Sequence, residues 1–216
     1  DVVVAHGGEP LKYVVPASSG VAKTAYYKVG LSSTELARPS RLRLFRALGR
    51  QVDLAVAVSN DIAVQLNAVL RVPLGRIRVI ANGRDPETYH PPVGGEAPPQ
   101  DAAQILFIGE LEVGKRPDLF LDVIAALRQQ GVSASAAMVG QGSLGTSLRS
   151  RADALGVAML GTRDDVPSLL RHADVLVITS APGTEGMPGV AIESGISAVP
   201  VVSTAAAGIA DVVEHG

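Results

Sequence analysis

Two glutamates eight positions apart, Glu185 and Glu193, form the most unusual chemical arrangement in this sequence. Glycines and Pro188 follow the first glutamate, and Pro188 suits the first turn of a helix because it has no N–H to leave unpaired. The backbone amides over 187–190 are then open donors at a helix N-terminus, which is a favourable place for a diphosphate. Carboxylates beside such an anion can accept hydrogen bonds from sugar or ribose hydroxyls. The alternative is that both glutamates interact only with the helix dipole or with water.

A glycine-rich segment, Gly140-Gln-Gly142-Ser-Leu-Gly145, matches the G-x-G-x-x-G pattern of dinucleotide-binding turns. It lies between a predicted strand and a predicted helix, and Asp164 follows about 20 residues later. An NAD(P)-dependent oxidoreductase is therefore one interpretation. The dinucleotide pattern normally follows the first strand of its domain, however, whereas this segment follows the second. The same glycines suit any tight strand-to-helix turn, so a phosphate-lined or purely structural turn is the other interpretation.

Composition limits the class of protein. The chain has 216 residues, 47% of them hydrophobic, which allows one large domain or two smaller ones. Lys and Arg number 19 against 21 Asp and Glu, so the overall charge does not favour nucleic acid, and no nucleic-acid partner is expected. The sequence has no cysteine, which excludes disulfides, a thiolate nucleophile and cysteine-bound zinc. Aromatic residues make up only 3% of the chain, so the core must be mostly aliphatic.

Short apolar runs alternate with amphipathic segments along most of the chain, which predicts an α/β protein with doubly wound parallel sheets. Strands are expected at 1–5, 54–58, 76–80, 104–108, 134–139, 157–160, 175–179 and 199–203. Helices are expected at 62–70, 117–129, 143–155, 166–172 and 190–197, with a last one from about 208. The apolar stretch 189–210 contains Pro200 and divides into a helix-like and a strand-like part, which argues against a membrane span.

A dense cluster of proline and glycine at 91–100 is the best candidate for a linker between domains. We therefore expect a first domain over 1–80, a linker over 81–103 and a second domain over 104–216.

The segment from Glu185 to Glu193 resembles the E-x7-E signature of retaining family 4 glycosyltransferases, in its form E-G-M-P-x-x-x-x-E. Other segments resemble further motifs of this family, in the same order. They are Val79-Ile-Ala-Asn-Gly-Arg-Asp85 for V-I-P-N-G-V-D, Ile108-Gly109-Glu-Leu-Glu-Val-Gly-Lys115 for G-R-L-x-x-x-K, Val139-Gly-Gln-Gly142 for V-G-x-G, Ala173-Asp-Val-Leu-Val177 for A-D-V-x-V, and 194–213 for G-x-P-V-V followed by G-G-I-x-E-x-V. The ordered set is more specific than any single motif.

The resemblance implies a GT-B fold of two Rossmann-like domains, with the acceptor bound by the first and a nucleoside-diphosphate sugar by the second. It implies a hexosyltransferase that retains the anomeric configuration and uses neither a metal ion nor another cofactor. The acceptor would be a sugar, a lipid or a small molecule. The family pattern also places elements before residue 1 and after residue 216, so we expect both domains to be truncated. A cytoplasmic protein is expected, with peripheral contact at the inner membrane face through the missing segments.

The resemblance also implies roles for individual residues. Glu185 would contact the transferred sugar near its reacting face, Glu193 would hold the ribose hydroxyls, and Lys115 would neutralise the donor diphosphate. His6 is similar to a first-domain histidine that faces the donor sugar, although it could equally be a loop histidine at a strand end. Gly109 would let the donor approach the backbone closely. The remaining donor-binding residues would be Gly186, Met187, Pro188 and Gly189.

Two positions depart from the family pattern. Glu110 stands where the family usually has an arginine, so an anion replaces a diphosphate-binding cation, and each such charge-assisted contact is worth about 1.5–3 kcal/mol. Either Arg116 or the helix amides compensate, or donor binding is weak, unless the Glu110 side chain points away from the donor. Arg84 stands where the family usually has an apolar residue after Asn-Gly. An inactive, glycosyltransferase-like fragment is therefore a third interpretation.

Overall fold

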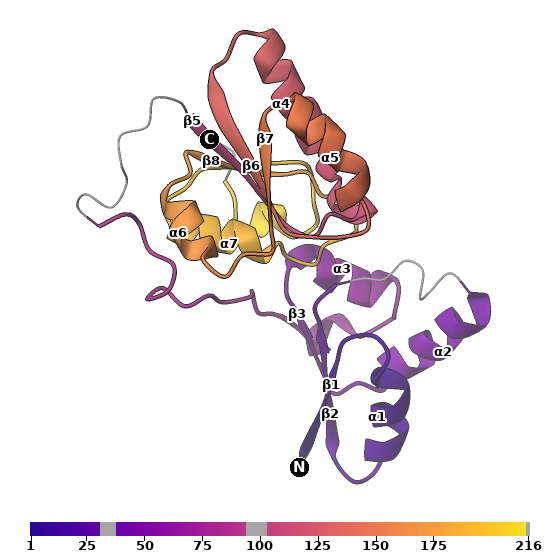
Figure 1. The fold of residues 1–216 in the computed structure, drawn as a ribbon. Helices are drawn as coiled ribbons and strands as arrows, with labels where there is room; N and C mark the ends of the chain where they lie inside the picture. Colours follow the sequence, from indigo (N-terminus) through magenta and orange to yellow (C-terminus); the bar gives the residue numbers. More distant parts are fainter. Residues whose placement is uncertain (31–37, 94–102, 215–216) are drawn as a thin grey trace. The chain divides into compact units, whose positions relative to one another are not determined.

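The computed structural model describes residues 1–30, 38–93 and 103–214 (Figure 1). They form two compact units, each with its own sheet. The four-stranded unit comprises Asp1–Asn82, Pro182–Pro188 and Ala207–Asp211, and the five-stranded unit comprises Gly83–Ala181, Gly189–Ala206 and Val212–Gly216. Residues 94–102 of the expected linker lie outside the described residues, and the domain limits 1–80, 81–103 and 104–216 stay a prediction.

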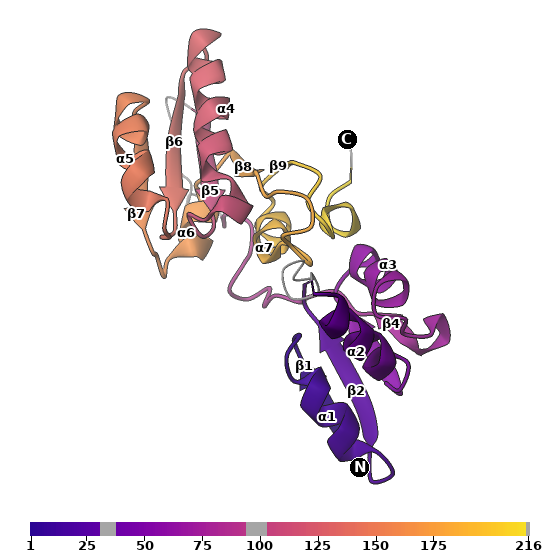
Figure 2. The same cartoon turned by 90° about the vertical axis from the view of Figure 1, so that its right-hand side faces the viewer.

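The four-stranded unit is a parallel sheet in the order β1-β2-β3-β4. Its elements are β1 (Val2–His6), α1 (Leu11–Ser18), β2 (Lys23–Lys28), α2 (Pro39–Gly49), β3 (Leu54–Ala57), α3 (Asn60–Ala68), the 3-10 helix η1 (Leu74–Arg76) and β4 (Ile77–Val79). Figure 2 shows α1 lying along β1 and β2. Sequence patterns predicted β1, β3, α3 and β4 but missed α1, β2 and α2. Pro16 inside α1 and the polar ends of β2 obscure the periodicity there.

Ser59 joins the N-terminus of α3 to a distant part of the same unit. Its buried hydroxyl accepts a hydrogen bond from the amide of Ile62 at 3.3 Å, as expected of a helix N-cap. The same hydroxyl donates to the carbonyl oxygen of Gly186 at 2.7 Å. The segment that follows the first glutamate of the E-x7-E pattern is therefore attached to α3.

We expect Ser59→Ala to lower the free energy of unfolding of the four-stranded unit by about 2 kcal/mol, since it removes a cap and leaves a buried carbonyl without its donor. Urea unfolding followed by circular dichroism measures this change. Ser147→Ala is a matched control, because Ser147 is exposed and its hydroxyl bonds only a carbonyl one turn away. Equal midpoints for the two variants would contradict this role of Ser59.

The five-stranded unit is a doubly wound parallel sheet, as the sequence predicts. Its strands follow the order β7-β6-β5-β8-β9. Its elements are β5 (Ala103–Ile108), the 3-10 helix η2 (Val113–Lys115), α4 (Pro117–Gln129), β6 (Ala134–Val139), α5 (Gly145–Ala154), β7 (Val157–Gly161), α6 (Val166–Arg171), β8 (Val175–Ile178), α7 (Gly189–Ile196) and β9 (Val201–Ser203). In Figure 1, α4 and α5 lie on one side of this sheet and α6 and α7 on the other.

The helix predicted from about 208 is wrong. The chain there forms a single 3-10 turn, η3 (Ile209–Asp211), in the four-stranded unit. Gly208 has a φ of 73°, and its amide donates to Asp61 at 2.8 Å. Asp211 accepts bonds from the backbone and side-chain nitrogens of Asn60, at 2.6 and 2.8 Å. The segment therefore bonds the first residues of α3 instead of continuing as a helix.

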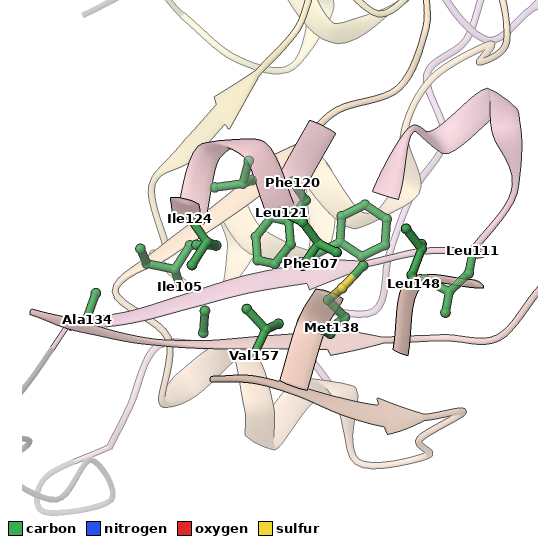
Figure 3. Packing of buried hydrophobic residues seen from close by; sticks show 13 residues of the cluster. Ile105, Phe107, Leu111, Phe120, Leu121, Ile124, Ala134, Met138, Leu148 and Val157 are labelled. Carbon is green, nitrogen blue, oxygen red and sulfur yellow. The ribbon is translucent and has the colours of Figure 1, made fainter. Parts of the chain in front are cut away.

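The main core of the five-stranded unit lies between the sheet and the layer of α4 and α5. Ile105 and Phe107 point into it from β5, whereas Leu106, between them, is buried on the opposite face, because side chains alternate along a strand. Figure 3 shows the rings of Phe107 and Phe120 together, and their centroids lie 5.5 Å apart. Among the described residues, no helix is both long and apolar enough to cross a membrane.

Candidate functional site

The order of strands in the five-stranded unit defines where a ligand can bind. From β5, at the centre of the sheet, the chain first builds β6 and β7 on one side and then β8 and β9 on the other. The connections after β5 and β8 therefore run over opposite faces of the sheet. In doubly wound sheets, ligands bind in the crevice that this divergence opens outside the carboxyl ends of the strands.

Lys115 lies in the connection that follows β5. The hydroxyl of Thr179, just after β8, donates to the carbonyl oxygens of Lys115 and Arg116, both at 2.8 Å. The amide of Ala181 donates to Gly114 at 2.8 Å, so the two connections are joined by hydrogen bonds. The aliphatic part of the Lys115 side chain passes beside Gly109, where a Cβ would lie 3.9 Å from its Cδ. The structure thus brings together two of the residues predicted to bind the donor.

Glu193 lies on α7, the helix that follows β8 in this unit. Its side chain is 13% exposed, and its Oε1 is 2.5 Å from the Nε of Arg84. Burial raises the pKa of Tyr89, and the charge of Glu193 adds to the effect. The guanidinium of Arg84 also lies against Gly189, where a Cβ would overlap it. Arg84, which departs from the family pattern, is therefore paired directly with Glu193, the residue predicted to hold the ribose hydroxyls.

A pocket of about 590 Å³ lies at the carboxyl ends of β5, β6 and β7. It is lined by Ile108, Gly109, Glu110, Glu112, residues 139–142, Thr162, Arg163 and Val166. Glu110, one of these lining residues, is exposed. The pocket combines apolar side chains with exposed backbone, which suits a flat ring and its polar edge.

The glycine-rich turn between β6 and α5 is explained by packing. A Cβ on Gly140 would overlap the carbonyl oxygen of Gly109, and one on Gly142 would lie 2.5 Å from that of Leu111. The carboxylate of Glu112 accepts bonds from the amide and hydroxyl of Ser143, both at 2.6 Å, and these bonds lower the pKa of Glu112. The turn therefore packs tightly on the connection after β5, and one of its amides, that of Ser143, already donates to the carboxylate of Glu112. These contacts favour the structural interpretation over the dinucleotide one.

The four-stranded unit carries the other predicted residues. His6 is exposed at the end of β1 and stacks on Tyr27, with ring centroids 5.1 Å apart. The hydroxyl of Tyr27 donates to Asn82 at 3.3 Å. Glu185 is half-buried in the segment Pro182–Pro188. Because Glu185 and Glu193 belong to different units, the roles predicted for Glu185 and His6 remain predictions.

The segment between Glu185 and α7 is mostly buried. Gly186, Met187 and Pro188 belong to the four-stranded unit, where a Cβ on Gly186 would overlap the carbonyl oxygen of Val29. Helix α7 begins at Gly189, one residue after Pro188. A glycine at 186 is therefore required by packing. Sequence reasoning did not find that Arg84 pairs with Glu193. The departure of Arg84 from the family pattern marked the position as unusual but gave no partner for it.

Parallel doubly wound sheets form a class of folds that bind their ligands at the switch point of the sheet. The chain belongs to the family described as "Glycosyl transferases group 1", whose family model matches residues 102–216. A second model, "Glycosyltransferase Family 4", matches residues 2–88. The predicted family is therefore confirmed.

Named relatives and solved structures agree with this assignment. The chain is 29% identical over 197 residues to a D-inositol 3-phosphate glycosyltransferase of Nocardiopsis dassonvillei, an alignment covering 82% of this chain and 46% of that protein. It is 32% identical over 109 residues to the Vi polysaccharide biosynthesis protein VipC/TviE of Salmonella typhi, covering 49% of this chain and 18% of that one. The structure of Anabaena Alr3699/HepE in complex with UDP matches with a TM-score of 0.85 at 24% identity, covering 100% of this chain and 62% of that chain.

These matches confirm the predicted GT-B type of fold. The chain spans less than half the length of these two curated relatives and about three fifths of the Anabaena structure.

Proposed function

We propose that this protein is a retaining glycosyltransferase that moves a hexose from a nucleoside-diphosphate sugar to an acceptor. The donor nucleotide would bind at the carboxyl ends of β5 and β8. One observation carries the proposal: the sheet order brings Lys115, after β5, and Glu193, on the helix after β8, to the same edge of one sheet. A cation for phosphate and a carboxylate for ribose hydroxyls are the groups that a nucleoside diphosphate needs.

The pocket beside this edge supplies a place for the nucleobase. Ile108 and Val166 offer apolar surface for the ring, and the exposed Gly142 offers backbone to a polar edge. The solved Anabaena protein was crystallised with UDP and with UDP-glucose, which makes UDP the first nucleotide to test here.

In the proposed reaction, the bond between the anomeric carbon and the donor phosphate oxygen breaks. The acceptor oxygen bonds to the same carbon from the same face, and its proton passes to the departing phosphate. The leaving nucleoside diphosphate gains negative charge, which Lys115 would stabilise in this proposal with no metal ion taking part. The acceptor would be a sugar, a lipid or a small molecule.

A ligand panel tests the proposed class of reaction. UDP, GDP, ADP and their sugar conjugates, with NADH as the comparison, are titrated while thermal unfolding is followed. A ligand that binds only the folded state raises the unfolding temperature, so we expect a shift with at least one nucleoside diphosphate and none with NADH. A shift with NADH alone would overturn the proposal in favour of an oxidoreductase. No shift with any nucleotide would favour the inactive interpretation.

Two substitutions test the donor site. We expect Lys115→Ala and Glu193→Gln each to weaken UDP binding about tenfold or more, because each removes a charge-assisted hydrogen bond to the ligand. Isothermal titration calorimetry measures the affinities. Lys23→Ala is a matched control, since Lys23 is 76% exposed and pairs with Asp53 in the other unit. If both site variants bound UDP as tightly as the wild type, the site assignment would be wrong.

A further inference from the structure

The segment that follows β4 supplies two side chains to Glu193. Arg84 contacts its carboxylate directly, and Tyr89 lies near enough for the charge of Glu193 to raise the pKa of its hydroxyl. A compact turn centred on Asp85 sets their separation: its carboxylate accepts bonds from the amide of Glu87 at 3.0 Å and the hydroxyl of Thr88 at 2.8 Å. These bonds lower the pKa of Asp85 and hold the turn in place. The two partners of Glu193 therefore come from one ordered segment.

The guanidinium of Arg84 is fixed at more than one point. Its Nε is 2.5 Å from Oε1 of Glu193, and its Nη1 donates to the carbonyl oxygen of Gly83 at 3.0 Å. Its Nη2 lies against Gly189, at the start of the helix that carries Glu193, in space that any other side chain at position 189 would fill. A flexible side chain held in this way can define the orientation of the carboxylate that it contacts.

The chemistry of a carboxylate gives this arrangement a consequence. Its two oxygens offer about four acceptor positions; Arg84 occupies one of them, on Oε1, and a bond from the neighbouring Tyr89 hydroxyl would take a second. The positions that remain are two, the number needed by a pair of neighbouring hydroxyls. The Glu193 side chain is mostly buried, so a carboxylate free to rotate there would lose both its neutralising partner and its fixed direction.

We propose that Arg84 and Tyr89 are positioning residues that orient the Glu193 carboxylate for the 2′- and 3′-hydroxyls of the donor ribose. This inference rests on the proposed function, because it requires a nucleotide whose ribose contacts Glu193. In this inference, Arg84, in the segment after β4, helps the chain to discriminate ribonucleotides from deoxyribonucleotides.

The test compares the affinities of UDP and 2′-deoxy-UDP, measured by calorimetry for the wild type, Arg84→Gln and Tyr89→Phe. We expect the wild type to prefer UDP about tenfold, the effect of one hydrogen bond to a charged group. In Arg84→Gln, UDP should lose the contacts of both hydroxyls and 2′-deoxy-UDP only that of its 3′-hydroxyl, so that the preference falls to about two- to threefold. Tyr89→Phe should also lower the preference for UDP over 2′-deoxy-UDP, by a smaller factor.

Controls separate this role from folding. Arg151→Gln makes the same charge change and breaks the exposed pair with Asp122, away from the proposed site, so it should keep the wild-type preference. Arg84→Lys keeps the charge but cannot reproduce the Nε contact, and it should give an intermediate preference. The unfolding temperature of each variant is recorded with and without UDP.

Other outcomes overturn the inference. If Arg84→Gln weakened both ligands equally and kept their ratio, Arg84 would contact the diphosphate or act only in folding. Tighter UDP binding by this variant would mean that Arg84 blocks the site. The proposed function fails in a different way: the wild type would then bind both ligands equally, or Glu193→Gln would leave UDP binding unchanged.

Discussion

Gly140→Ala is expected to destabilise the five-stranded unit by about 3 kcal/mol or more, because two separate costs combine. The new Cβ would overlap the carbonyl oxygen of Gly109, a residue whose amide donates to the carbonyl oxygen of Val139 at 2.9 Å. The residue also has a φ of 132°, a conformation that side chains other than glycine rarely adopt. Urea unfolding monitored by circular dichroism measures the loss.

Gly145→Ala is the matched control from the same glycine pattern. Its Cβ would meet Leu111 at 3.5 Å, an ordinary contact, and Gly145 begins α5. We expect it to change stability by less than about 1 kcal/mol and to leave UDP binding intact. Comparable destabilisation by the two substitutions would contradict the packing explanation of this turn. Full stability of Gly140→Ala would reopen the interpretation of these glycines as a ligand-binding loop.

Phe120→Ala is expected to cost about 3–5 kcal/mol, a large part of the stability of an ordinary domain. Phe120 is fully buried on α4, and its ring packs against Phe107 of β5. Truncation leaves a cavity between helix and sheet and removes an aromatic pair. Because β5 leads directly to Gly109, we also expect weaker UDP binding near the unfolding transition.

Phe120→Leu provides the first comparison for this prediction. Leucine keeps most of the buried volume and should cost about 1.5 kcal/mol or less. Tyr13→Ala removes an aromatic ring that is 67% exposed in the other unit and should change stability little. Guanidinium unfolding of the three variants gives the ranking. A loss in Phe120→Ala no larger than in Tyr13→Ala would contradict the assignment of this core.

Most strands and helices of the five-stranded unit were predictable. A strand buried on both faces of a parallel sheet must be apolar throughout, so β5, β6 and β8 stand out in the sequence without any knowledge of their neighbours. Segments between them with helical periodicity mark α4 and α5 for the same reason. The prediction failed at η3, because the hydrogen bonds that Gly208 and Asp211 form with α3 are tertiary and leave no local pattern.

The candidate site was predictable as a set of residue types, but its internal contacts were not. The spacing of Glu185 and Glu193 pointed to a donor site, yet the two glutamates belong to different compact units. Glu110 looked like a serious loss of positive charge, and the structure places it, exposed, among the residues that line the pocket. The role of Arg84 appeared only once its partner on α7 was seen.

The amino-acid sequence by itself determined the α/β class, the order of most elements and the family, because apolar periodicity and local motifs are written along the chain. Only the tertiary structure decided which residues meet. The contact of Arg84 with Glu193 joins residues 109 positions apart, and that of Ser59 with Gly186 joins residues 127 apart. Such pairs depend on strand order and on the packing of whole elements. Hydrophobic periodicity identifies which face of an element is buried, whereas its partner is set by the topology of the sheet.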